Sequence, residues 1–158
     1  MNNEFILILD NIRSVENVGS IFRTAECFGV SKIVLVGITP APVDRFGRKR
    51  TDFSKVSLGS EKLVSYEACK SISPKLEELK KEGYKIIALE QHPLSTKLSN
   101  FPTSKLKNFA LVVGNEVEGV SKEALELADD IVEISMMGMK ESLNVSVATG
   151  VALYHLLK

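Results

Sequence analysis

The stretch Ile131-Val-Glu-Ile-Ser-Met-Met-Gly-Met-Lys-Glu-Ser-Leu-Asn-Val-Ser-Val-Ala-Thr-Gly-Val-Ala-Leu-Tyr154 decides how this chain is expected to fold. It begins as a short apolar strand, Ile131 to Ile134. It continues as a loop with a glycine and three methionines, and it ends as a helix that is apolar almost all round. Ser142 and Asn144 flank Leu143 where this helix begins. Because the first turn of a helix presents unpaired N–H groups, a buried helix that opens with Ser and Asn side chains indicates a binding site.

The rest of the chain alternates apolar runs with helical patterns. The runs suited to buried parallel strands are residues 5–9, 32–36, 84–89 and 109–113, with a shorter strand at 63–66. Helices are expected after Asn17, which can cap the first of them, from Ser73-Pro74 to Gly83, and from Ser121 to Leu127. This alternation predicts an α/β fold with a mostly parallel sheet and helices on both faces.

Composition describes an ordinary globular protein, expected to form one domain over residues 1–158. Lys and Arg together number 20, as do Asp and Glu, so any nucleic-acid surface must be a local patch. No membrane-spanning run or signal peptide is recognisable, which favours a cytoplasmic protein without a membrane partner. Cys27 and Cys69 are expected to be reduced and buried. Together with His92 and His155 they lack the spacing of metal ligands, so no metal is expected.

A dense positive patch lies in the long loop that starts at Gly37. Its cations are Arg45, Arg48, Lys49, Arg50 and Lys55. Against them stands one acid in the same segment, Asp52. The patch has two interpretations. It is either a solvated loop whose charges serve solubility, or a loop that contacts RNA phosphates. In the second case Phe46 or Phe53 would stack on a base or anchor the loop.

Three polar clusters follow predicted strands, at the edge of a parallel sheet where ligands bind. They are residues 11–23, Gly114-Asn115-Glu116 and Ser142-Leu143-Asn144. Taken singly, each is equally well explained as a helix cap or a turn. No Gly-x-Gly-x-x-Gly follows the first strand, which argues against a nicotinamide dinucleotide site.

Taken together, the clusters resemble the three motifs of the SpoU-type tRNA/rRNA ribose 2′-O-methyltransferases of the SPOUT superfamily. The segment Asn11-Ile-Arg-Ser-Val-Glu-Asn17-Val-Gly19-Ser-Ile-Phe-Arg23-Thr24-Ala25 is similar to the first motif. Leu111-Val-Val-Gly114-Asn115-Glu116-Val-Glu-Gly119-Val is similar to the second, and Ile134-Ser-Met136 followed by Ser142-Leu143-Asn144-Val-Ser-Val-Ala148 to the third. One departure is Val117, where the family commonly has glycine, and this puts the backbone geometry of that loop in doubt.

The resemblance implies a fold and a set of partners. Family members bind S-adenosylmethionine in a C-terminal trefoil knot, an exception to the usual rule against threaded chains. They are homodimers with the knot helices at the interface and an active site shared between protomers. The donor is expected to contact Leu89, Gly114, Ile134, Met136 and Leu143.

The family's catalytic and structural polar positions correspond to Asn17, Arg23, Glu116, Ser142 and Asn144. The implied reaction is attack of a ribose 2′-hydroxyl on the sulfonium methyl group. Arg23 has been cast as the family's general base, but an arginine stays protonated at ordinary pH. The favoured hypothesis is that Arg23 clamps the target phosphate and stabilises the developing alkoxide.

The expected function is therefore S-adenosylmethionine-dependent RNA 2′-O-methylation. tRNA is favoured over rRNA because no appended RNA-binding domain is recognisable. One alternative is a catalytically silent RNA-binding or assembly factor on the same fold. The other is a flavodoxin-like enzyme that binds a phosphorylated cofactor at the first loop.

Overall fold

The computed structural model of the protein describes residues 2–158, and its centre is a seven-stranded sheet in the order β3-β2-β1-β6-β4-β7-β5. The strands are β1 (Phe5–Asp10), β2 (Lys32–Val36), β3 (Ser65–Cys69), β4 (Lys85–Leu89), β5 (Thr96–Lys97), β6 (Phe109–Gly114) and β7 (Asp130–Glu133). Every pairing between these strands is parallel. The predicted parallel α/β sheet is confirmed.

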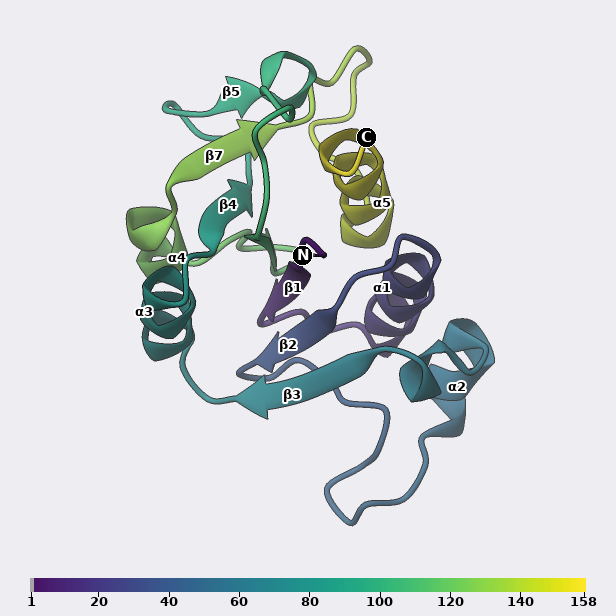
Figure 1. Cartoon of the computed structure of the whole chain (residues 1–158). Coiled ribbons are helices and arrows are strands. Elements are labelled where there is room, and N and C mark those ends of the chain that lie inside the picture. The colour runs from purple at the N-terminus through teal and green to yellow at the C-terminus, as the bar shows by residue number, and fades with distance from the viewer. Residues whose placement is uncertain (1) are drawn as a thin grey trace.

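The helices cover both faces of this sheet, as Figure 1 shows. One face carries α1 (Val15–Cys27), α2 (Thr51–Ser57) and α5 (Val145–Leu156), and the other carries α3 (Ile72–Lys81) and α4 (Lys122–Leu127). The strands alternate their side chains between the two layers. In β1, Leu7 and Leu9 pack toward α1, whereas Ile6 and Ile8 pack toward α3. Central strands covered on both sides explain why the apolar runs are continuous.

The C-terminal helix, expected to be buried, is buried on one side only. α5 packs beside α1, and Ala152, Leu153 and Leu156 join the core beneath them. Its N-cap is Asn144, whose side chain accepts a hydrogen bond from the Ser146 backbone N–H at 2.9 Å. A helix that is apolar all round therefore buries one side and leaves another uncovered.

Several local expectations are wrong. Residues 51–57 form α2, a helix inside the stretch expected to be a loop. The strand expected at 63–66 is instead β3, which begins at Ser65 and pairs with β2 at the sheet's periphery. α1 is capped by Ser14, because its hydroxyl accepts from the Asn17 N–H, so Asn17 lies inside the first turn.

Two further expectations also need correction. α3 begins at Ile72, so Ser73 is not its cap and Pro74 lies at its third position. Cys27 is exposed and Cys69 is half-buried, so the expectation of two buried thiols is wrong. Within residues 2–158, every helix is too short or too polar to cross a lipid bilayer.

The strand order determines where a ligand can bind. Parallel strands place all their carboxyl ends at one edge, and the loops after β1, β4, β6 and β7 leave from that edge. The chain reverses its direction of winding at β1, which pairs with β2 on one side and β6 on the other. A crevice at such a reversal is the usual ligand site of an open α/β sheet.

Candidate active site

A cavity of about 700 Å³ opens at the carboxyl edge of the sheet. Its walls come from the loops after β4, β6 and β7 and from the beginning of α5. Its volume is in the range of small-molecule and cofactor sites. All the residues predicted from the resemblance to contact a methyl donor line it: Leu89, Gly114, Ile134, Met136 and Leu143.

Gly114 lets the loop after β6 fold tightly against the strand end. A Cβ at this position would lie 2.2 Å from the Gly119 carbonyl carbon and 2.2 Å from the Val120 nitrogen. Asn115 and Gly119 exchange backbone hydrogen bonds of 3.0 and 2.9 Å, which close the turn. Gly119 takes φ of +74°, a region that favours glycine, whereas Val117 is not among the residues of positive φ. The departure at Val117 is therefore accommodated without backbone strain.

Two carboxylates fix this loop by accepting hydrogen bonds from its backbone. Glu90, after β4, accepts a hydrogen bond from the Val120 N–H at 2.8 Å, and Asp10, at the end of β1, accepts one from the Ser121 N–H at 2.8 Å. Asp10 is only 1% exposed. Sequence reasoning missed both residues, although an acidic residue at the carboxyl end of a buried strand is a recognisable signal. They make the wall of the cavity a fixed structure.

A hydrogen-bond network joins the three polar clusters. The Glu116 carboxylate accepts from the backbone N–H groups of Arg13 and Ser14, each at 3.0 Å, and from the Asn17 side-chain amide at 3.1 Å. The Asn17 side-chain oxygen in turn accepts from the Asn144 amide at 3.1 Å. Residues far apart in the sequence thus meet in one network, of which Glu116 and Asn144 line the cavity.

Glu116 is ionised in this network. Burial raises the pKa of its carboxyl group, but the hydrogen bonds from Arg13, Ser14 and Asn17 outweigh it and hold the pKa below its ordinary value. An anion at the start of α1 is also stabilised by the helix dipole. Its occupied oxygens make Glu116 a residue that positions Asn17 and the first loop, and a poor acceptor of a further proton.

Ser142 lines the cavity next to Leu143, but Arg23 does not lie with the other predicted residues. Arg23 is exposed on α1, further along the helix than Asn17, and is not part of the cavity wall. Within residues 2–158, the Arg23 side chain has no hydrogen bond or ion pair. One chain therefore brings together Asn17, Glu116, Ser142 and Asn144, and leaves Arg23 apart.

The cavity is acidic. Glu90, Glu116 and Glu118 line it, and in the described part of the chain no lysine or arginine does. Like charges repel strongly in a partly enclosed site, so this lining disfavours a phosphate group and favours a ligand that carries positive charge. Apolar side chains from Leu89, Ile134 and neighbouring residues supply the rest of the wall.

The basic loop predicted from the sequence lies between β2 and α2. Its net positive charge is smaller than the number of its cations suggests, because two of them are paired with acids. Asp44 forms an ion pair with Arg48 at 3.0 Å, and Asp52 pairs with Arg50 at 3.0 Å. The expectation of one acid overlooked Asp44. The described residues give Arg45, Lys49 and Lys55 no ion-pair partner, so these cations are the ones available to phosphates.

The two phenylalanines of the loop have different roles. Phe53 is completely buried in α2, where its ring centroid lies 5.2 Å from that of Phe22 in an edge-to-face arrangement. It anchors the short helix to α1. Phe46 is 67% exposed at the tip of the loop. Phe53 therefore has the predicted anchoring role, whereas Phe46 is exposed to solvent.

The fold and the site define a parallel α/β domain with an acidic ligand cavity built by three loops at its carboxyl edge. Comparison with known proteins identifies the family. Residues 4–154 match the family described as "SpoU rRNA Methylase family". The chain belongs to that family, as the resemblance of its motifs indicates.

Named relatives modify either of two RNAs. The chain is 37% identical over 152 residues to the tRNA (guanosine(18)-2′-O)-methyltransferase of Aquifex aeolicus, which covers 96% of this chain and 67% of the relative. It is 35% identical over 149 residues to the 23S rRNA (guanosine-2′-O-)-methyltransferase RlmB of Neisseria meningitidis, with coverage of 94% and 56%. The chain thus spans between half and about two thirds of these relatives.

Solved structures agree with this assignment. The TrmH/SpoU tRNA modifying enzyme of A. aeolicus superposes with a TM-score of 0.83 at 34% identity, over 99% of this chain and 75% of that one. The AdoMet-bound rRNA methyltransferase of Sinorhizobium meliloti gives a TM-score of 0.87 at 26% identity, over 99% and 56%. The fold of the whole described chain is therefore the fold of these enzymes.

Proposed function

We propose that the protein is an S-adenosylmethionine-dependent methyltransferase that modifies the ribose 2′-hydroxyl of RNA. The acidic cavity carries this proposal. The cavity gathers every residue expected to contact the donor, and within residues 2–158 no lysine or arginine lines it. S-adenosylmethionine carries a sulfonium and an ammonium against one carboxylate, so it is a net cation that complements this lining. A relative of known structure is described as AdoMet-bound.

When bound, S-adenosylmethionine supplies an electrophilic methyl group. The residues of this chain that would hold it are Leu89, Ile134, Met136 and Leu143 as apolar walls, and Gly114 through its main chain. The exposed N–H and C=O groups of the irregular loops can read the edge of an adenine. Because Glu90 and Asp10 fix the loop after β6, the cavity needs little rearrangement to accept its ligand.

On the acceptor side, the network aligns the groups that meet the ribose. Glu116 fixes Asn17, and Asn17 is joined to Asn144 at the start of α5. Ser142 lines the same cavity. These residues act by orientation, which is a large part of catalysis when two reactants must be held in line.

Arg23 supplies the positive charge that the acidic cavity lacks. We keep the hypothesis that its guanidinium clamps the phosphate of the target nucleotide and stabilises the alkoxide that forms as the hydroxyl loses its proton. Its place outside the cavity of its own chain supports an active site shared between two protomers, in which Arg23 reaches the partner's cavity.

The uncovered side of α5 supports a homodimer. Val147, Val151 and Tyr154 are 52%, 42% and 67% exposed along one stripe. Together with Ser20 and Thr24 of α1 they line an open hollow of about 550 Å³. An apolar stripe of this kind next to a ligand site is typical of a protein interface. A second copy that covers it would lie beside the Arg23 helix.

The C-terminal knot expected from the resemblance is part of the same proposal. β7 lies beside β4, on the far side of β6 from β1, yet the chain after β7 returns to pack α5 on α1. The segment 134–144 must therefore cross the loops that leave β4 and β6, and these are the loops that form the cavity. This crossing supports a threaded C-terminus.

The RNA is proposed to be tRNA in preference to rRNA, in the cytoplasm where both occur. The tRNA-modifying relative from A. aeolicus shares slightly higher identity than the rRNA-modifying one from N. meningitidis, 37% against 35%. The available cations of the loop between β2 and α2 would contact phosphates of the RNA near the cavity.

Titration calorimetry and a methyl-transfer assay test the proposal. S-adenosylmethionine should bind, and flavin mononucleotide should not, because the cavity repels phosphate. Labelled methyl groups should then pass to bulk tRNA more rapidly than to bulk rRNA. Donor binding without transfer to either RNA would favour the catalytically silent factor. Binding of the flavin nucleotide without S-adenosylmethionine would favour the flavodoxin-like alternative.

A further inference from the structure

The tip of the loop between β2 and α2, residues 43–49, is an ordered turn that we call the tip hairpin. Val43 and Lys49 form an antiparallel bridge. Inside it, the Asp44 N–H donates to the Arg48 carbonyl at 2.8 Å and the Gly47 N–H donates to the Asp44 carbonyl at 3.0 Å. Gly47 takes φ of +77°, which glycine adopts without strain. The hairpin therefore holds its side chains in a defined arrangement.

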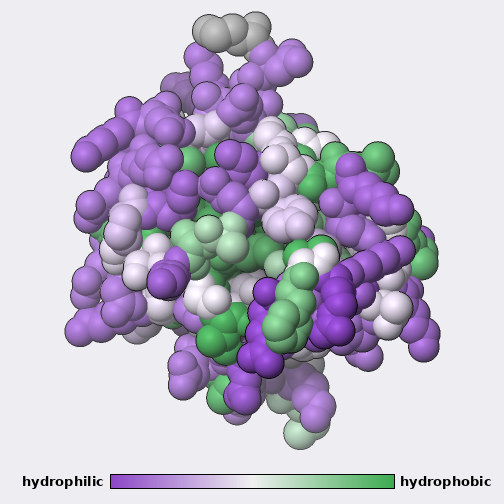
Figure 2. Space-filling model, turned by 90° about the horizontal axis from the view of Figure 1, so that it is seen from below, coloured by the Kyte–Doolittle hydropathy of each residue, from purple (hydrophilic) through white to green (hydrophobic). Residues whose placement is uncertain are grey.

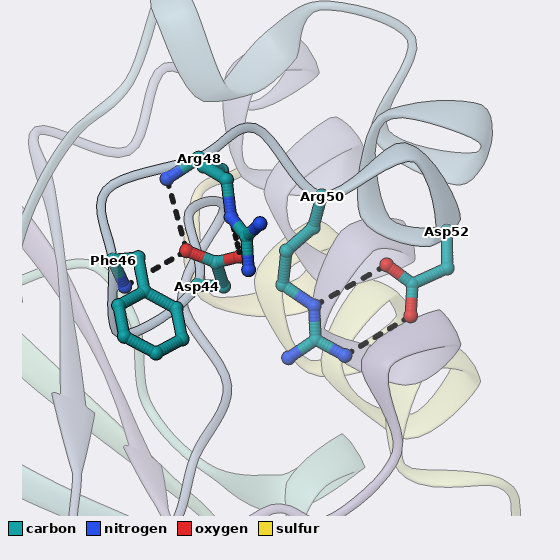
Figure 3. Close-up of polar contacts among 5 residues, drawn as sticks. All are labelled: Asp44, Phe46, Arg48, Arg50 and Asp52. Carbon is teal, nitrogen blue, oxygen red and sulfur yellow. Dashed lines mark hydrogen bonds and ion pairs between the residues drawn. The ribbon is translucent and has the colours of Figure 1, made fainter.

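One carboxylate organises this arrangement, as Figure 3 shows. Asp44 accepts from the backbone N–H groups of Phe46 at 2.8 Å and Arg48 at 2.9 Å, and from the Arg48 Nε at 3.0 Å. The hydrogen bond from the Arg48 backbone is the main reason that the pKa of Asp44 lies below its ordinary value, and it outweighs the effect of burial. Asp44 thus stays ionised and fixes both Phe46 and Arg48.

Phe46 projects from the hairpin with 67% of its surface exposed, and two guanidinium groups lie over its ring. The Arg45 and Arg48 guanidinium carbons lie 4.8 and 5.0 Å from the ring centroid. The Arg48 guanidinium is held by its hydrogen bond to Asp44. The Arg45 guanidinium is held by its cation–π contact with the Phe46 ring. Attraction of an exposed cation to a ring is weak. Arg45 can therefore leave the ring when another planar group takes its place.

The hairpin belongs to the same edge of the sheet as the cavity. Its loop leaves from the carboxyl end of β2, and the cavity is built at the carboxyl ends of β4, β6 and β7. In Figure 1 the loop projects well beyond the body of the protein. Figure 2, viewed from the side of that projection, shows apolar surface bordered by strongly hydrophilic surface. An RNA that reaches the cavity can extend along this edge to the hairpin.

We propose that the tip hairpin is a base-stacking site for an unpaired nucleotide of the RNA. The base stacks on the Phe46 ring, while Arg45 moves from the ring to an adjacent phosphate and Arg48 stays in place. This inference rests on the proposed function, because it takes RNA to be the substrate. Stacking suits an unpaired base since every base has an exposed face, and it requires no particular sequence.

The test measures binding of two fluorescein-labelled RNAs, a single-stranded oligoadenylate and a fully paired duplex. Phe46→Ala should weaken oligoadenylate binding about tenfold and leave duplex binding nearly unchanged. Phe46→Trp should keep wild-type affinity, whereas Phe46→Leu should behave like the alanine variant. Leu63→Ala is the matched control, because Leu63 is a comparably exposed apolar residue, 72% exposed, outside the hairpin. It should bind as the wild type does.

Equal oligoadenylate affinity in wild type, Phe46→Ala and Phe46→Leu would overturn the stacking site. Equal loss for oligoadenylate and duplex would also overturn it, because the base pairs inside a duplex have no free face for the ring. Steady-state kinetics with bulk tRNA separate this inference from the proposed function. Phe46→Ala should raise KM for tRNA and leave kcat and donor affinity unchanged. A wild type that transfers no methyl group, beside a Phe46→Ala variant that still loses oligoadenylate affinity, would refute the proposed function and leave the stacking site standing.

Discussion

Replacing Gly114 with alanine should weaken donor binding by about a hundredfold. The added Cβ would lie 2.2 Å from the Gly119 carbonyl carbon and the Val120 nitrogen, and 2.5 Å from the Gly119 oxygen. All three neighbours are backbone atoms, so no side chain can turn away to make room. Ordinary contact with a Cβ starts near 3.4 Å. The loop after β6 must therefore retreat from β6 by roughly 1 Å, and this loop is a wall of the cavity.

The expected magnitude follows from that displacement. A misplacement of about 1 Å in a binding constellation costs on the order of a hundredfold, so affinity for S-adenosylmethionine should fall by about that factor. Overpacking of this kind also destabilises a protein by about 1–3 kcal/mol. The loop is held by Glu90 and Asp10 through hydrogen bonds to Val120 and Ser121, and these bonds oppose the retreat.

Calorimetric titration with S-adenosylmethionine measures the effect, and circular dichroism establishes that the variant is folded. Gly138→Ala is the matched control. It adds the same methyl group to the loop after β7, where nothing lies within 4 Å and φ is not positive. It should bind the donor as the wild type does. A folded Gly114→Ala protein with wild-type affinity would refute the assignment of this loop as a wall of the donor site.

The other predictions concern the network, the clamp, the basic loop and the dimer. Glu116→Gln should destabilise the protein by about 1 kcal/mol at neutral pH, because exposed charge-assisted hydrogen bonds are lost. In the wild type, the pKa of Glu116 is lower in the folded state than in the unfolded state. The urea midpoint of the wild type should therefore exceed that of the variant above the ordinary glutamate pKa, and the difference should disappear as the pH falls through the pKa of the folded state. Arg23→Lys should lower kcat at saturating RNA, and near-normal turnover would refute a bidentate clamp. The double variant Arg45→Gln and Lys49→Gln should reduce the slope of log affinity for single-stranded RNA against log salt by about 1.4 without changing donor affinity, and an unchanged slope would remove these cations from the interface. Val151→Glu should convert a dimer into a monomer in light scattering, because it places a charge in the apolar stripe of α5, whereas a variant that stays dimeric would place the interface elsewhere.

The sequence predicts the strands well where they are buried on both faces. The residues of β1, β2, β4 and β6 are continuous apolar runs because helices cover both sides of the central sheet. β3 was misplaced because it is a peripheral strand of mixed polarity, half-buried or exposed throughout. Strand order could not be deduced from the sequence, since the spacing of apolar runs does not specify which strands become neighbours.

Local signals also explain the helix errors. The helix α2 escapes sequence analysis because it is short, its N-cap residue Arg50 makes no capping side-chain hydrogen bond, and it buries little beyond Phe53. Its stability comes from packing on α1, which no local pattern records. Asn17 is a reasonable cap by residue type, but the Ser14 hydroxyl takes that place, and the Asn17 side chain joins the network with Glu116 and Asn144 instead.

Some residues of the candidate site are predictable from the sequence and others are not. The cavity gathers all five predicted donor contacts, because three loops at one edge of a parallel sheet must converge. Glu90 and Asp10 stand at recognisable positions at strand ends, but their role is not predictable, because each binds a backbone N–H that is distant in sequence. The separation of Arg23 from the cavity depends on the rotation of α1, and a motif does not reveal which side chains of a helix face a ligand.

The most direct test of the central claim is the position of the transferred methyl group. RNA should be incubated with the protein and methyl-labelled S-adenosylmethionine, treated with alkali, and its products separated. A 2′-O-methyl group removes the hydroxyl that attacks the neighbouring phosphate, so the label should remain in alkali-resistant dinucleotides. Label in ordinary mononucleotides would place the methyl group on a base, and the absence of label from all RNA would show no transfer. Either result would contradict an RNA ribose 2′-O-methyltransferase.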